Sequence, residues 1–186
     1  DSTRTVEEPK NEQKISFIFF LCLTVFLTVI FGKVRYTDSD PIASLLVSQA
    51  IIKQGTVKLD SYKGIFERYR CVITENEDVY GCVIYKKNNH YYYYFPLGTP
   101  VFSVPFVAII NIIGYDVIDY EKRFQIIISA INATLIFALL FFLACLYLDD
   151  TKSFLISGVT WFGTSFASTT GTALWSHNFA TLFALL

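Results

Sequence analysis

The chain has 186 residues and a formal net charge of −1 at pH 7, so its charge gives no indication that it binds nucleic acid or another polyanion. Apolar residues make up 53% of the sequence and charged residues only 17%, which is typical of membrane proteins and argues against an ordinary soluble domain. The sequence does not begin with Met and stops within the apolar run 182–186, so we expect an N-terminal fragment of a longer membrane protein.

The first apolar segment predicts a transmembrane helix. Residues 1–14 are polar and are expected to form a cytoplasmic tail, whereas residues 15–32 carry no charge. As a helix this run would be about 27 Å long, close to the thickness of the hydrocarbon core of a bilayer. A signal peptide is the alternative, but it would have a shorter apolar core and a cleavage site of small residues, whereas Lys33 and Arg35 follow here.

Residues 33–123 are expected to form one large exoplasmic loop, and a helix is predicted near its start. Apolar residues within 41–54 recur with a helical period, and Gly55 ends the pattern. Pro41 suits the first position of a helix because its missing N–H has no partner there in any case.

Two carboxylates precede this helix. Asp40 or Ser39 could cap it, because a short polar side chain before the first turn can accept a free backbone N–H. Asp38 is left beside the end of the first span, and a carboxylate at the depth of a membrane is a candidate functional residue. A solvated turn is the alternative interpretation of Asp38.

Short β-prone runs separated by polar turns predict a small hairpin or meander over about 69–95. Cys71 and Cys82 flank its first turn, and a disulfide between them would link the two runs in an oxidising compartment. Two free thiols are the alternative, because the register of the strands does not follow from the sequence. No Cys or His spacing matches a zinc site.

Four consecutive tyrosines, at 91–94, end the β-prone region. Tyrosines are common at membrane interfaces, where the ring lies in lipid and the hydroxyl in water. The alternative is a wall of rings that stacks on a sugar.

The apolar segment 101–114 is too short to cross a membrane, because its helix would be only about 21 Å long. We expect a kinked helix that lies along the membrane surface, with Pro105 in its second turn. A short or re-entrant span is the alternative.

The rest of the chain predicts further spans. Residues 124–148 carry no charge, 149–153 form a polar cytoplasmic turn, 154–168 return as a third span, and 173–186 begin a fourth. The predicted fold is therefore an α-helical polytopic membrane protein, with transmembrane helices and a large exoplasmic loop that carries two juxtamembrane helices and a small β-hairpin or meander.

The order of these features resembles the start of the GT-C class of membrane glycosyltransferases, which includes protein O-mannosyltransferases and lipid A aminoarabinose transferases. The resemblance is carried by Asp38 after the first span, the helix over 41–54, the segment YYFPLGTPVFSVPFVAIINIIG, the triplet Glu121-Lys122-Arg123 before the second span, and the segment TALWSHNFATLFALL. It covers nearly the whole chain. The individual motifs are weak, and their order and spacing are the specific part.

The resemblance implies transfer of a sugar from a polyprenyl-phosphate donor to a lipid, glycan or protein acceptor at the plasma membrane, or at the inner membrane of a Gram-negative cell. Asp38 is implied as the general base, which must reach the acceptor hydroxyl. The family often has Asp-Glu where this chain has Asp-Ser-Asp, so Asp40 is a second candidate. A divalent metal is compatible with the two carboxylates, although their spacing gives it no support.

The leaving phosphate gains charge during this reaction and needs a fixed cation or hydrogen-bond donor. Lys122, Arg123 and His177 are the candidates. Lys122 and Arg123 could instead be ordinary interfacial anchors, and His177 could cap a helix.

Two other classes of function remain open. A membrane protein without enzymatic activity, such as a transporter or an assembly subunit, would be expected to carry intramembrane charges and broken helices. A flippase or polymerase that handles the same lipid carrier would be expected to have basic residues along its spans. The predicted spans carry almost no charge, which favours chemistry at the large loop.

Overall fold

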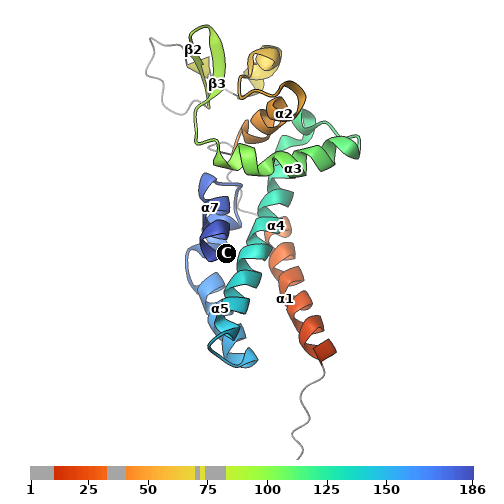
Figure 1. The fold of residues 1–186 in the computed structure, drawn as a ribbon, viewed down its shortest axis with the longest axis vertical. Helices are drawn as coiled ribbons and strands as arrows, with labels where there is room; N and C mark the ends of the chain where they lie inside the picture. The colour runs from red at the N-terminus through yellow and green to blue at the C-terminus, as the bar shows by residue number, and fades with distance from the viewer. Residues whose placement is uncertain (1–10, 33–40, 70–71, 74–82) are drawn as a thin grey trace, which may run out of the picture.

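The fold was analysed in a computed structural model that describes residues 11–32, 41–69, 72–73 and 83–186. Helices dominate, and a small three-stranded sheet lies near one end of the molecule (Figure 1). The elements in chain order are α1 (Asn11–Phe31), α2 (Ser44–Gln54), the 3₁₀ helix η1 (Asp60–Tyr69), β1 (Val72–Ile73), β2 (Ile84–Lys87), β3 (His90–Tyr93), α3 (Gly98–Ile112), α4 (Val117–Cys145), α5 (Asp150–Gly163), α6 (Phe166–Thr170) and α7 (Ser176–Leu185).

The long helix α4 runs through the whole structure. Its later turns pack against α1, α5, α6 and α7, and its first turns meet α2 and α3 (Figure 1). Asp116 caps its start by accepting the backbone N–H of Ile118 at 2.8 Å. Gly114, at φ 91°, lies between α3 and α4, in a left-handed conformation that suits glycine.

The prediction of a polytopic membrane protein with four spans is wrong. Within the described parts of the chain, α4 is the one helix long and apolar enough to cross a membrane, and 44% of its most apolar window is buried in the structure. A mostly buried core helix of a soluble protein can pass the same test of length and composition.

The predicted third span is too short as a helix to cross a membrane. α1 extends over Asn11–Phe31, but the helix at the predicted third span, α5, has only 14 residues. Thr164 adopts an extended conformation, and the chain leaves helical form again between α6 and α7. These breaks divide the apolar C-terminal region into three short helices.

The sheet also differs from a meander, because β1 pairs with β2 in parallel. β2 and β3 form an antiparallel hairpin that pairs Ile84 with Tyr93 and Lys87 with His90. Asn88 and Asn89 both have positive φ, 50° and 62°. Two consecutive residues of this kind make the turn that matches the twist of a two-residue hairpin.

The helix predicted over 101–114 occupies Gly98–Ile112, and the helix predicted over 41–54 occupies Ser44–Gln54. In Figure 1, α3 lies across the end of α4, close to α2 and to the top of α7. This arrangement places α2, α3, η1 and the sheet together at one end of the helices.

Three buried apolar clusters hold these parts together. The first joins α2 and η1 to the hairpin, the second joins α1, α4 and α5, and the third joins α2, α3, α4 and α7. Their central members include Leu46, Leu59, Ile84, Ala133, Ile136, Trp161, Leu45, Val107 and Leu174.

Candidate functional site

A row of buried polar side chains runs along one face of the otherwise apolar helix α4. It consists of Glu121, Gln125, Ser129 and Asn132, which are spaced four, four and three residues apart and therefore lie on the same face of a helix. Their exposed fractions are 7%, 1%, 1% and 0%. Buried polar side chains require partners, so the neighbours of this row determine what it can do.

The upper end of the row meets the start of α2. An oxygen of Glu121 accepts the backbone N–H of Leu45 at 3.3 Å, and Nε2 of Gln125 donates to the carbonyl of Pro41 at 2.6 Å. The residue that precedes α2 is Ala43, which has φ 63° and no side chain able to cap. Because the first N–H groups of a helix have no partner within it, the carboxylate of Glu121 supplies an acceptor from a different helix.

The lower end of the row binds the chain where α6 ends. Oγ of Ser129 lies within hydrogen-bonding distance of the carbonyls of Thr170, at 2.8 Å, and Ala173, at 3.0 Å. Nδ2 of Asn178 on α7 reaches the same two carbonyls at 3.3 and 2.8 Å. Side chains of α4 and α7 therefore satisfy backbone oxygens that the break between α6 and α7 leaves without helical partners.

Some polar atoms in and beside the row have no hydrogen-bond partner within the described part of the structure. They are Oε1 of Gln125, Oδ1 and Nδ2 of Asn132, and Oδ1 of Asn178 on α7, and all of them are buried. Such atoms cost free energy unless water or a polar ligand satisfies them. The row therefore contains buried donors and acceptors that no described protein group satisfies.

Further polar contacts join α2 to α3 beside the row. Oγ of Ser48 lies 2.7 Å from the carbonyl of Pro100, and Nδ2 of Asn111 donates to Oε1 of Gln49 at 2.7 Å. Ser48 and Gln49 are fully buried. These contacts fix α3 against α2.

The residues predicted to be functional fall into two groups. Asp38, Asp40, Cys71 and Cys82 lie outside the described residues, so the carboxylate pair and the disulfide remain predictions. Lys122, Arg123 and His177 are described and exposed.

The structure does not join these cations into one site. The guanidinium of Arg123 lies 5.5 Å from the centre of the Tyr120 ring, in a cation–π contact on its own helix. His177 stacks on Trp175 with ring centres 6.1 Å apart and an angle of 10°. Within the described residues, no contact links Arg123 to His177.

A second polar group, which sequence reasoning missed, lies beside the hairpin. Nδ1 of His90 is 2.6 Å from Oδ2 of Asp60, and Nζ of Lys58 is 3.2 Å from Nε2 of the same histidine. The other oxygen of Asp60 accepts the backbone N–H of Tyr91 at 2.8 Å. When the ring of His90 is neutral, Nε2 accepts from the Lys58 ammonium, which can only donate, and Nδ1–H donates to Asp60; when the ring is protonated, Nδ1–H still donates to Asp60.

These contacts lower the pKa of Asp60 below its usual value of 3.8. Desolvation acts to raise it, but the hydrogen bonds from Tyr91 and His90 and the charges of His90 and Lys58 act together in the opposite direction. Asp60 is therefore held as a carboxylate at neutral pH.

The missed residues had different signals. Glu121, Gln125, Ser129 and Asn132 could have been found, because their spacing places four polar groups on one face of an apolar helix. Asp60 and His90 are 30 residues apart in the chain, and no local pattern relates them.

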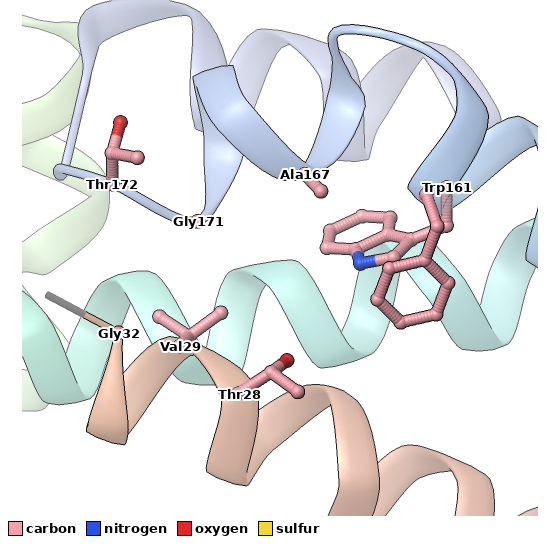
Figure 2. A pocket seen from close by; sticks show the side chains of 8 residues that line it. Thr28, Val29, Gly32, Trp161, Ala167, Gly171 and Thr172 are labelled. Atoms are coloured by element: carbon pink, nitrogen blue, oxygen red, sulfur yellow. The ribbon is translucent and has the colours of Figure 1, made fainter. Parts of the chain in front are cut away.

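A mainly apolar cavity of about 220 Å³ opens between α1 and the bend from α5 to α6 (Figure 2). Thr28, Val29 and Gly32 line it from α1, and Trp161, Phe162, Ala167, Gly171 and Thr172 line it from the other side. Gly171 allows the close approach of these segments, because a Cβ there would lie 2.5 Å from the carbonyl oxygen of Ala167 and 3.3 Å from Cγ2 of Val29.

No group of three or more His, Cys, Asp or Glu side chains that could hold a metal ion occurs in the described ranges. The chain matches no known family model, no curated protein and no solved structure.

Proposed function

We propose that the chain belongs to a membrane-associated glycosyltransferase that moves a sugar from a polyprenyl-phosphate donor to an acceptor on the exoplasmic side of the plasma membrane. The observation that carries the proposal is the buried carboxylate of Glu121 at the start of an apolar helix, bound to the first turn of α2. Ionisable side chains that are buried among apolar segments are rare and are candidates for a functional role. The acceptor would be a lipid, a glycan or a protein.

The segment that carries Asp38 and Asp40 joins the described chain at Pro41, whose carbonyl is bound by Gln125. In the proposed reaction, Asp38 removes the proton of the acceptor hydroxyl as its oxygen attacks the anomeric carbon of the sugar. The bond between that carbon and the phosphate oxygen breaks, and polyprenyl phosphate leaves with the bonding electrons. Asp40 is the second candidate carboxylate. It is not the cap of α2 that the sequence predicted, because the helix begins at Ser44 and the residue before it is Ala43.

The leaving phosphate requires a cation near the start of α4. Lys122 and Arg123 directly follow Glu121, on the exposed side of the helix. His177 is exposed at the start of α7. This start lies near α3, because Oγ1 of Thr99 on α3 is 3.3 Å from the carbonyl oxygen of Trp175, two residues before His177. We assign donor-phosphate binding to the adjacent Lys122 and Arg123 as part of the proposal, with His177 on α7 as the alternative cation.

The test uses the full-length protein in liposomes with undecaprenyl phosphate linked to mannose, glucose or 4-aminoarabinose as the donor and with extracted membrane lipids, glycans and proteins as acceptors, and it measures release of undecaprenyl phosphate. Asp38→Asn keeps the shape of the side chain but removes its basicity, so release should fall by about 100-fold or more. Asp40→Asn is the matched control and should have a small effect, because we assign the proton transfer to Asp38. The reverse pattern would exchange the two roles, and no release from any donor would contradict the proposal.

A non-enzymatic assembly subunit is the second candidate, and a specific observation favours it. Leu155, Ile156, Val159 and Phe162 on α5 are all more than half exposed. An apolar surface of this kind suits contact with lipid or with another helix. If the full-length protein inserts and neither carboxylate affects transfer, this function accounts better for the chain.

A further inference from the structure

The tyrosine run has two faces. Tyr93 is 6% exposed and packs in the cluster with α2, and the Tyr91 ring lies 4.9 Å from that of Phe66 on η1. Successive residues of a strand point to opposite faces, so Tyr92 and Tyr94 lie on the outer side of the hairpin. Tyr94 is 61% exposed. Only part of the run is therefore needed for the core.

Tyr85 on β2 completes the outer face. It pairs with Tyr92 across the hairpin, with ring centres 5.6 Å apart and an angle of 29°. The Tyr94 ring stands at 87° to the Tyr85 ring, with centres 6.3 Å apart. The three rings therefore form a corner, with two nearly parallel rings and a third perpendicular to Tyr85.

One end of this corner is polar. His90 pairs with Lys87 in the strand register, and its ring lies 6.4 Å from that of Tyr92. Lys58 reaches His90, and the carboxylate of Asp60 is already engaged by His90 and by the N–H of Tyr91. Lys58 and Lys87 therefore add positive charge beside the rings, while the nearby carboxylate already has partners.

We propose that the outer face formed by Tyr85, Tyr92 and Tyr94, with Lys58, Lys87 and His90 at its end, binds a single hexose ring that carries a carboxylate or a phosphate. The apolar C–H face of a pyranose packs on an aromatic ring, and the perpendicular Tyr94 would contact its edge. The cations complement the negative group. This inference does not depend on the proposed transfer reaction.

The geometry favours one sugar over a nucleic acid. Single-stranded nucleic acids stack successive bases on a series of rings along a continuous basic groove. Here the third ring is turned across the other two, and the whole chain has a formal net charge of −1. A corner with cations at one end suits a compact anionic ligand.

The experiment measures binding to the full-length protein by isothermal titration. The probes are glucuronic acid and glucose 6-phosphate, which distinguish the two sources of negative charge, together with glucose and a 15-nucleotide oligothymidine. At least one acidic sugar should bind, and glucose should bind at least about tenfold more weakly, because it lacks the charge. Equal binding of glucose, tighter binding of the oligonucleotide, or no sugar binding at millimolar concentration would each overturn the proposal.

Substitutions locate the site. Tyr92→Ala and Tyr94→Ala should each weaken binding of the acidic sugar by about 3- to 10-fold, the usual effect of an aromatic contact. Lys87→Ala should weaken binding of the acidic sugar and leave binding of glucose unchanged. Tyr115→Ala removes a tyrosine that is 54% exposed between α3 and α4 and serves as the matched control. If Tyr92→Ala fails to fold, the test depends on Tyr94→Ala, because Tyr94 is exposed. The assignment would be contradicted if Tyr115→Ala weakened binding of the acidic sugar as much as Tyr94→Ala does.

Discussion

The carboxylate of Glu121 on α4 accepts the backbone N–H of Leu45 on α2 at 3.3 Å, across 76 residues of sequence. The contact supplies a cap to a helix whose own preceding residue, Ala43, cannot provide one. A single side chain of α4 therefore contributes both to the packing of α2 and to the polar row.

Replacing Glu121 should show this role in the stability of the protein. Glu121→Ala leaves a buried N–H without its acceptor, so we expect a loss of about 1–3 kcal/mol in the free energy of unfolding. Glu121→Gln keeps an oxygen acceptor and should lose less. Thermal unfolding followed by circular dichroism compares the two variants, and equal losses would show that the hydrogen bond to Leu45 contributes little.

Gly171 should not tolerate a side chain. In Gly171→Ala the new methyl group would lie 2.5 Å from the carbonyl oxygen of Ala167 on α6 and 3.3 Å from Cγ2 of Val29 on α1, so the backbone at the end of α6 would have to shift. Overpacking of this kind typically costs about 1–3 kcal/mol.

The matched control is Gly158→Ala within α5, where a Cβ would meet no atom within 4 Å. Alanine in the interior of a helix is more favourable than glycine by about 0.5–1 kcal/mol, so this variant should be more stable. Chemical denaturation should show a lower free energy of unfolding for Gly171→Ala and a higher one for Gly158→Ala than for the wild type. A destabilised Gly158→Ala would mean that α5 packs differently from the structure.

Asn132 and Ser129 should respond differently to alanine. Asn132→Ala removes an amide that has no hydrogen-bond partner within the described chain, so the gain from removing it should offset the lost packing and leave stability within about 1 kcal/mol of the wild type. Ser129→Ala loses contacts with Thr170 and Ala173 and should cost about 1 kcal/mol or more. Equilibrium unfolding in urea measures both. A large loss in Asn132→Ala alone would indicate that its amide binds a molecule in the folded protein.

The hairpin should loosen in acid through Asp60. The folded pKa of this carboxyl lies below its usual 3.8, so its stabilising effect is complete above that value and is lost as the pH falls through the lower folded pKa. The amide resonance of Tyr91, which donates to Asp60, should titrate with a midpoint below 3.8 in a nuclear magnetic resonance experiment.

His90→Ala should raise that midpoint, because it removes a hydrogen bond and a charge that lower the pKa. The control is the amide of Lys152. It reports on Asp149 at the start of α5, whose pKa is lowered by hydrogen bonds from Lys152 and by the charge of that residue. Its midpoint should not move in His90→Ala. A Tyr91 midpoint that is unchanged by the substitution would contradict the role assigned to His90.

Local patterns gave the positions of several elements, and tertiary contacts decided the rest. Pro41 and Gly55 mark the limits of a helix that the structure gives as Ser44–Gln54, and the start at Ser44 depends on Glu121 from far along the chain. The number of spans was wrong because apolar composition does not show where Thr164 leaves helical form.

The candidate site was only partly within reach of the sequence. The four polar residues of α4 lie on one face by spacing alone, but their burial and their partners depend on how α2, α6 and α7 fold against them. The tyrosine run suggested either a membrane interface or a sugar-binding wall, and strand alternation in the structure shows which rings are in the core. The parallel pairing of β1 with β2 joins segments whose order in the sheet no local signal specifies.

α4 connects the two ends of the molecule, because it packs against α2 and α3 near its start and against α1, α5 and α7 along its later turns. Its only non-helical residue, Tyr120 at φ −122° and ψ 21°, lies directly before Glu121. After Tyr120 the helix packs against α1, α5 and α7, and before it the chain leads back to α3. If α2 and α3 moved relative to the other helices, we therefore expect α4 to bend at Tyr120. The hydrogen bond between Glu121 and Leu45 lies beside this residue and would lengthen or break in such a movement.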